Sequence, residues 1–237
     1  MGRVVLCLLI LIAVPALADE SIATLFKHGT TAMDEGRTEE ARDTFARAIQ
    51  SAPSWGLAYL SYGIAEQTLK PDSEKARNAF EKAVQLEPEN PRAHYYLGLA
   101  YERVGRFSEA MNQYRQAIAK RPQLEDAHLQ LGNLQRLQGD HVGAITSFET
   151  LIALEPDNVG ALLTAAELYE KVQRFDDAEH ALIQVTRLAP TVAYHQYRLA
   201  KYYERVGNAP KARHAYARAD SLKSPQRRKM RPLLPSK

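Results

Sequence analysis

Apolar side chains recur along this chain with the spacing of helices, and the apolar stretches come in pairs. In residues 91–104, and again in residues 108–120, the apolar positions fall on one face of a helix of roughly three to four turns. Gly105 follows the first stretch and Pro122 follows the second, and these residue types commonly end helices. The pattern predicts two amphipathic helices that a tight turn connects.

The helix pair is repeated along the chain. Successive prolines mark the period, with separations of 35, 34, 34 and 34 residues: Pro53, Pro88, Pro122, Pro156 and Pro190. The sequence Tyr-Glu-Arg-Val-Gly occurs at residues 101–105 and again at residues 203–207. Glycine occupies one position of the period, just after the first helix: Gly36, Gly105, Gly139 and Gly207. A period of this length predicts stacked units of two helices each.

The repeat resembles the tetratricopeptide repeat (TPR), whose pattern is W-x2-L-G-x2-Y, then A-x3-F, then P. Residues 91–124 match it well, with His in place of Trp and Tyr in place of Phe: His94, Leu97, Gly98, Tyr101, Ala110, Tyr114, Ala117 and Pro122. The pattern predicts six repeats, the fifth of them weaker: 22–55, 56–90, 91–124, 125–158, 159–192 and 193–226. The resemblance implies an all-α solenoid over residues 22–226, coiled as a right-handed superhelix.

The sixth repeat is expected to close the stack. One position of the second helix is apolar in the first four repeats, then Thr186, then Asp220. Asp220, with Arg213 nearby, indicates a polar end surface instead of a face that packs against a further repeat. We expect residues 227–237, which follow, to form a loose basic tail.

The N-terminus has the features of a secretory signal peptide. Arg3 precedes an apolar stretch at residues 4–17, and Ala-Leu-Ala at residues 16–18 matches a cleavage site. The stretch is short for a membrane span, which usually needs about 18 or more apolar residues. We expect residues 1–18 to be removed and the protein to be exported, most simply to a bacterial periplasm, with no membrane span after cleavage. An uncleaved anchor and a eukaryotic secretory route are the alternatives.

The excess of basic residues comes from the C-terminus. Lys+Arg 31 against Asp+Glu 28 gives a net charge of +3. Without Arg3 and the five basic residues of the segment 226–237, residues 19–225 have a net charge of −3. An acidic body without a broad basic face argues against a nucleic-acid partner. The basic tail could bind phosphate groups or an anionic membrane surface, although a solvated tail is the simpler interpretation.

The sequence contains no catalytic, cofactor-binding or metal-binding signature. Cys7, the only cysteine, lies in the leader, so the mature chain has no thiolate nucleophile, disulfide or cysteine metal site. The phosphate-binding, dinucleotide-binding, zinc-protease and serine-hydrolase motifs are missing. His94 and His128 lie 34 residues apart. We interpret them as equivalent packing positions and not as a metal pair, because zinc usually takes about three or four protein ligands.

The TPR resemblance implies a concave groove lined by the first helices, at repeat positions 2, 5, 9 and 12. In repeats three to six these positions predict protein-binding residues: Arg92, Tyr95, Leu99, Glu102, Asp126, Leu129, Asn133, Arg136, Leu163, Glu167, Tyr194, Tyr197 and Lys201. Gly160, Glu170 and Glu204 occupy the remaining groove positions of the fifth and sixth repeats. Phe26, Thr30, Leu57 and Leu60 are expected to continue the groove in the first two repeats. Tyrosine and arginine anchors suit peptide binding, but tyrosine and leucine here could also pack against neighbouring helices. The Lys and Asn residues with which some TPR proteins clamp a peptide carboxylate are largely absent.

The sequence therefore predicts a non-enzymatic scaffold that binds a peptide or protein segment in its groove. Exported proteins of this resemblance serve the assembly of pili, secretion systems, the outer membrane and cytochromes, and the sequence does not choose among these processes. Two alternatives stay open. One is an accessory subunit of a cell-wall enzyme, and the other is a surface-binding module that uses the basic tail.

Overall fold

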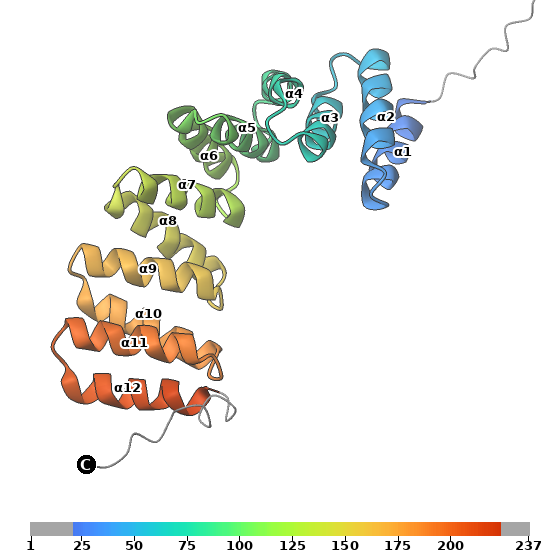
Figure 1. Cartoon of the computed structure of the whole chain (residues 1–237). Coiled ribbons are helices and arrows are strands. Elements are labelled where there is room, and N and C mark those ends of the chain that lie inside the picture. The colour runs from blue at the N-terminus through green and yellow to red at the C-terminus, as the bar shows by residue number, and fades with distance from the viewer. Residues whose placement is uncertain (1–20, 224–237) are drawn as a thin grey trace, which may run out of the picture. The chain divides into compact units, whose positions relative to one another are not determined.

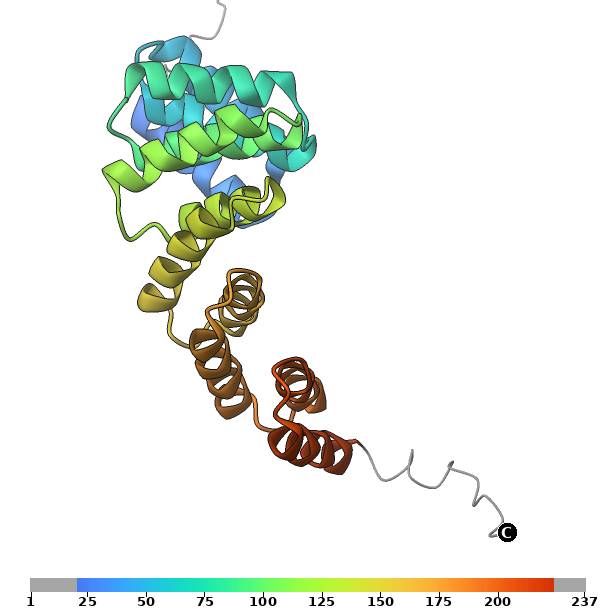
Figure 2. The same ribbon diagram turned by 90° about the vertical axis from the view of Figure 1, so that its left-hand side faces the viewer.

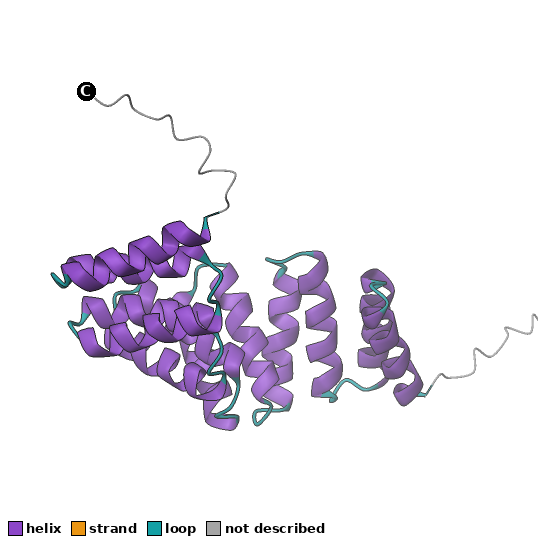
Figure 3. Cartoon of the chain, turned by 90° about the horizontal axis from the view of Figure 1, so that it is seen from below, coloured by secondary structure: helices purple, strands orange, loops and turns teal. Residues whose placement is uncertain are grey.

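Residues 21–223, which the computed structural model describes, form twelve α-helices and contain no strand (Figures 1 and 3). The helices are α1 (Ile22–Asp34), α2 (Thr38–Ser51), α3 (Gly56–Leu69), α4 (Glu74–Leu86), α5 (Pro91–Arg103), α6 (Phe107–Lys120), α7 (Glu125–Leu137), α8 (His141–Leu154), α9 (Val159–Lys171), α10 (Phe175–Leu188), α11 (Ala193–Arg205) and α12 (Ala209–Leu222). None of these helices combines the length and apolar character that a membrane span requires. The expected all-α class is confirmed, whereas the predicted leader and tail lie outside the described residues.

The described residues divide into two compact units, with the boundary between Pro88 and Glu89. The first unit contains α1–α4, and the second contains α5–α12. Within each unit every helix packs against the helix that follows it, and the two helices of one repeat pack most closely (Figure 2). Short loops join these helices, so each repeat is a helix-turn-helix pair, and within a unit neighbouring pairs bury their apolar faces against each other.

In five of the six repeats the turn between the two helices contains a left-handed backbone residue. Four glycines supply it with φ between +75° and +81°, and open space surrounds the point where each Cβ would stand: Gly36, Gly105, Gly139 and Gly207. The sequence predicts this role, because glycine adopts positive φ without a steric penalty. In the fifth repeat Gln173 takes the same place with a φ of 62°. This non-glycine residue therefore carries a conformational cost that the four glycines avoid.

The second helix of a repeat begins in one of two ways, and the two alternate along the chain. In repeats two, four and six the N-cap side chain accepts a hydrogen bond from a backbone N–H of the first turn: Ser73, Asp140 and Asn208. In repeats one, three and five an N-cap arginine pairs with an acid three residues later: Arg37–Glu40, Arg106–Glu109 and Arg174–Asp177. These acids lie in the first helical turn, where the helix dipole favours negative charge.

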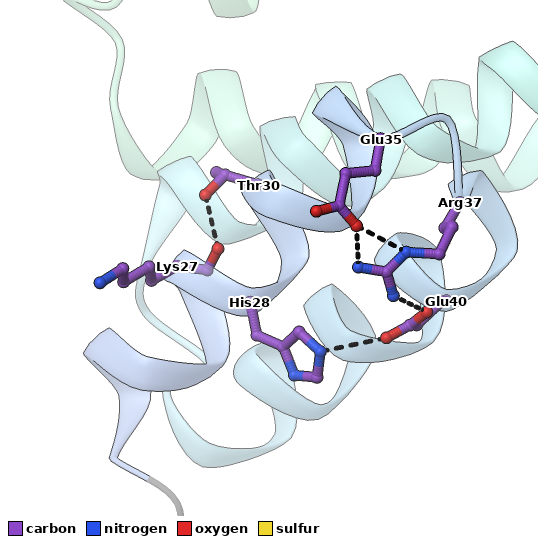
Figure 4. Close-up of polar contacts among 6 residues, drawn as sticks. All are labelled: Lys27, His28, Thr30, Glu35, Arg37 and Glu40. Atoms are coloured by element: carbon purple, nitrogen blue, oxygen red, sulfur yellow. Dashed lines mark hydrogen bonds and ion pairs between the residues drawn. The ribbon is translucent and has the colours of Figure 1, made fainter.

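The first of these arginine turns belongs to a wider polar cluster in the first unit (Figure 4). Arg37 contacts both Glu35 and Glu40, and His28 Nε2 lies 3.0 Å from Glu40 Oε1. The Arg37 hydrogen bond, with help from the His28 charge, holds the pKa of Glu40 below its usual value. The cluster ties α1 to the start of α2.

Glycines in the first helices allow aromatic rings of the second helices to approach the backbone. A Cβ on Gly98 would lie 2.6 Å from Cε1 of Tyr114, and a Cβ on Gly63 would lie 2.5 Å from Cε1 of Phe80. The rings of Tyr114 and Phe80 are fully buried. The small residues of the repeat pattern therefore let two helices pack at short range.

Candidate protein-binding site

The predicted groove residues lie on the first helices of the second unit, α5, α7, α9 and α11. Seven of them are exposed: Arg92, Asp126, Arg136, Glu167, Tyr194, Tyr197 and Lys201. Six are half-buried: Tyr95, Leu99, Glu102, Leu129, Asn133 and Leu163. Each of these residues therefore keeps some side-chain surface, and the exposed group is rich in charge and tyrosine.

Of the four residues expected to line a groove in the first unit, one is not available at the surface. Three of the four residues are half-buried: Phe26, Thr30 and Leu57. The Thr30 hydroxyl donates to the Lys27 carbonyl at 2.8 Å (Figure 4). Leu60 is only 1% exposed, so its assignment to the groove is wrong. The reason is that α3 has buried residues around most of its circumference.

Two half-buried groove residues also serve the core of the second unit. The ring of Tyr95 lies 5.9 Å from the ring of Tyr114. Burial raises the pKa of Tyr95 to about 12. Leu99 packs against the same cluster of buried side chains. By contrast, Tyr194 is 53% exposed and Tyr197 is 41% exposed on α11, which makes these two residues better probes of a surface function.

Four residues at predicted groove positions line a hollow of about 1160 Å³ in the second unit: Glu167, Glu170, Lys201 and Glu204. We call it the α9–α11 hollow, because α9 and α11 supply most of its wall: Glu167, Glu170, Lys171, Phe175, Arg198, Lys201, Glu204, Arg205 and Val206. Ion pairs link the two helices, with Arg198 at 2.7 Å from Glu167 and Arg205 at 2.5 Å from Glu170. Acids of the fifth repeat thus meet bases of the sixth.

Sequence reasoning missed five residues of this wall: Lys171, Phe175, Arg198, Arg205 and Val206. The two arginines stand one residue after repeat positions that the family resemblance assigns to the groove, and Phe175 begins α10. A signal was nevertheless present, since Glu170 and Arg205 have opposite charges and lie 35 residues apart, close to one repeat. Opposite charges at this separation lie on first helices of successive repeats, where they can pair.

In two repeats a tyrosine of the second helix holds a groove-side glutamate of the first. The Tyr114 hydroxyl donates to Glu102 at 2.6 Å, and the Tyr216 hydroxyl donates to Glu204 at 2.9 Å. Both pairs occupy repeat positions 12 and 24. Burial and this hydrogen bond raise the pKa of Tyr114 well above its usual range, so the hydroxyl keeps its proton and remains a donor. The core thereby fixes the carboxylates of Glu102 and Glu204.

The equivalent histidines have separate hydrogen-bond partners. His94 Nδ1 lies 2.7 Å from Oε1 of Gln113, and His128 Nε2 lies 2.9 Å from the carbonyl oxygen of Pro122. Both histidines are 7% exposed. Across residues 21–223, no three His, Cys, Asp or Glu side chains are grouped as a metal site would require. The packing interpretation of the two histidines therefore agrees with their surroundings.

Sequence models of the tetratricopeptide repeat match most of the chain. The matches cover residues 23–54, 72–125, 100–159 and 135–202, which together exceed half of its length. The chain belongs to the TPR family. The six helix-turn-helix pairs are therefore TPR motifs, and the architecture is an all-α TPR solenoid.

Solved TPR structures resemble the chain, although no curated protein matches it. YrrB, described as a TPR protein with an unusual peptide-binding site, is 19% identical over 76% of this chain and 92% of its own, with a TM-score of 0.67. PilF of Pseudomonas aeruginosa is 19% identical over 86% of this chain and 93% of its own, with a TM-score of 0.66. PilW, described as a widely conserved type IV pilus biogenesis factor, is 21% identical over 90% of this chain and 99% of its own, with a TM-score of 0.63. Likeness at this identity shows a common fold.

Proposed function

We propose that this chain is a non-enzymatic scaffold that binds a protein or peptide segment along the first helices of its second unit. Membership in the TPR family supports a role in protein interaction. The observation that carries the proposal is the surface of α9 and α11, where the α9–α11 hollow adjoins exposed tyrosine. Arg198, which lines the hollow, has its guanidinium 5.9 Å from the ring centre of Tyr194.

The side chains on this surface are suited to holding a peptide. Tyr194 and Tyr197 offer large rigid rings with a polar end, so they bury area at a low cost in side-chain entropy. Arg198 is only 19% exposed and is tied to Glu167, so its position is fixed before a partner arrives. A preorganised surface loses less entropy on binding, which favours affinity.

We further propose that the partner belongs to an assembly of the cell envelope, and that the chain reaches this compartment by export. Similarity of fold to PilF and PilW, the latter described as a pilus biogenesis factor, supports an assembly role. The leader-like sequence at residues 1–18 supports export. N-terminal sequencing of the protein from its native host should begin at Asp19, and a chain that keeps its leader in the cytoplasm would contradict export.

Site-specific photo-crosslinking in the native cell tests the binding surface. A photo-reactive phenylalanine analogue replaces Tyr197 on α11 or, as the control, Val142 on α8, which is 70% exposed. We expect a discrete crosslinked protein from position 197 and little from position 142. In purified form, Tyr197→Ala should weaken binding of that protein about tenfold. Equal crosslinking from the two positions, or unchanged affinity, would place the partner elsewhere on the chain.

A further inference from the structure

Three of the six repeats carry glutamate at position 12, but only two of these glutamates have an internal hydroxyl donor. Glu102 and Glu204 receive hydrogen bonds from tyrosine at position 24. In the fifth repeat the glutamate is Glu170 and position 24 is Leu182, which is 1% exposed and carries no donor. The repeat thus keeps the acceptor without the hydroxyl that accompanies it elsewhere in the chain.

Within residues 21–223, only one of the two carboxylate oxygens of Glu170 has a partner. Its side chain is only 10% exposed, and Oε2 pairs with Arg205 at 2.5 Å. Oε1 is buried and has no hydrogen-bond partner among the described residues. Burial raises the pKa of this carboxyl, and the nearby charges of Arg205 and Arg198 only partly offset the effect. A buried carboxylate oxygen without a hydrogen-bond donor is costly, so a ligand that donates a hydrogen bond to Glu170 would remove this cost.

The rest of the α9–α11 hollow favours a neutral ligand with an aromatic ring. Its charged lining is nearly balanced, with three acids and four bases: Glu167, Glu170, Glu204, Lys171, Arg198, Lys201 and Arg205. A further cation or anion would therefore meet like charge as well as opposite charge. Phe175 is 45% exposed and Val206 is 40% exposed at the same wall, which provides apolar surface for a ring.

Elsewhere in this unit the chain combines a glutamate, a cation and a tyrosine in one recurring arrangement. Tyr169 donates to Glu149 at 3.0 Å, while Arg174 lies 4.6 Å from the Tyr169 ring centre and 3.0 Å from Glu149. A second group has the same form, with Lys211 in place of arginine: Tyr203, Glu179 and Lys211. Glu170 and Arg205 form the same kind of ion pair but lack the tyrosine.

We propose that the α9–α11 hollow binds a tyrosine side chain of the partner segment, whose hydroxyl donates to Glu170 and whose ring lies against Arg205, Phe175 and Val206. Rotation of the carboxylate about its last side-chain torsion brings either oxygen toward the hollow. The Arg205 side chain is 58% exposed and is free to shift from the carboxylate onto the ring face. This inference rests on the proposed function, because it names the side chain that the scaffold recognises.

Binding of two small probes to the full mature chain tests the proposal. N-acetyl-tyrosinamide and N-acetyl-phenylalaninamide differ only by the hydroxyl, and amide NMR shifts report where each binds and how tightly. We expect shifts at α9 and α11 and a Kd about tenfold lower for the tyrosine probe, the effect of one hydrogen bond to a charged acceptor. Equal affinities, shifts confined to other helices, or preference for N-acetyl-lysinamide would overturn the proposal.

Two variants serve as matched tests of the acceptor. Leu182→Tyr recreates the internal donor of the third and sixth repeats, and Glu170→Gln removes the charge of the acceptor. Leu182→Tyr should abolish the preference for the tyrosine probe, and Glu170→Gln should reduce it, because an amide oxygen accepts a weaker hydrogen bond than a carboxylate does. An unchanged preference in either folded variant would contradict the proposal. If crosslinking from Tyr197 captures a partner while both probes bind equally, only this inference fails. If crosslinking also fails, the proposed function fails with it.

Discussion

The hydroxyl of Tyr114 donates a 2.6 Å hydrogen bond to the carboxylate of Glu102, twelve residues earlier in the chain. Tyr114 is fully buried, whereas Glu102 is half-buried on a first helix. One contact therefore connects the core of the repeat to the surface where we propose that a partner binds. A change in the core can alter the orientation of a surface carboxylate, and the chain offers variants that separate the two effects.

Removal of this hydroxyl should lower stability. Tyr114→Phe keeps the ring but leaves Glu102 without its donor, and the expected loss is about 1 to 2 kcal/mol in the free energy of unfolding. Urea unfolding followed by circular dichroism measures it. Tyr216→Phe is the control, since Tyr216 is half-buried and makes the same bond to Glu204, so its loss should be smaller. If the free energy of unfolding is unchanged in Tyr114→Phe, the hydrogen bond to Glu102 does not contribute to stability.

The left-handed turn of the fifth repeat should be open to improvement. Gln173 has a φ of 62°, so Gln173→Gly relieves the strain and should raise the free energy of unfolding by roughly 0.5 to 1 kcal/mol. Gly139→Ala makes the reverse change at the same repeat position, where open space leaves only the backbone cost, and should lose about 1 kcal/mol. Thermal melting distinguishes the two variants, because the melting temperature should rise in Gln173→Gly and fall in Gly139→Ala. A lower melting temperature in Gln173→Gly would show that the backbone at Gln173 is not strained.

Close packing at the repeat glycine should make it intolerant of alanine. A Cβ at Gly98 would lie 2.6 Å from the buried ring of Tyr114, so Gly98→Ala should cost about 1 to 3 kcal/mol. Gly160 is the matched control on α9, because the nearest atom to its Cβ position is 3.4 Å away. Gly160→Ala should stabilise the chain by a few tenths of a kcal/mol through helix propensity. Similar melting temperatures for the two variants would rule out this packing effect.

Two glutamates of the second unit should affect the pH dependence of stability with opposite sign. Burial raises the pKa of Glu170, so the folded state binds its proton more tightly, and the stability from this group is lost as pH rises above 4.5 through the folded pKa. The free energy of unfolding of Glu170→Gln, compared with that of the native chain, should therefore rise as the pH goes from acidic to neutral. Urea titrations across this range measure the difference, and a constant difference would contradict the raised pKa.

Glu179 provides the opposite case. The Lys211 hydrogen bond, followed by that of Tyr203, lowers the pKa of Glu179 against the effect of burial. Its stabilising contribution is present above 4.5 and is lost as pH falls through the folded pKa. The free energy of unfolding of Glu179→Gln should therefore fall furthest below that of the native chain at neutral pH. In acid the two values should come closer together. The same urea titrations test this, and a difference that grows in acid would reverse the assignment.

The amino-acid pattern was sufficient to predict the two helices of a repeat and the glycine turn between them. The period near 34 residues and the turn at Gly105 and its equivalents follow from helical periodicity and from the conformational preferences of glycine and proline. These are short-range properties, since residues three or four positions apart share a helix face in any surroundings. The choice of the first helices as the surface that carries the candidate groove residues came from the resemblance to the TPR family.

Tertiary packing decided which of those residues are available and what they contact. Leu60 lies in the core because helices surround α3, and Arg198 and Arg205 reach the hollow because the stacking of α9, α10 and α11 brings successive repeats together. The two oxygens of Glu170 differ only in what packs beside each of them. Burial and hydrogen bonding depend on distances between separate helices, and these distances result from the fit of all their side chains together.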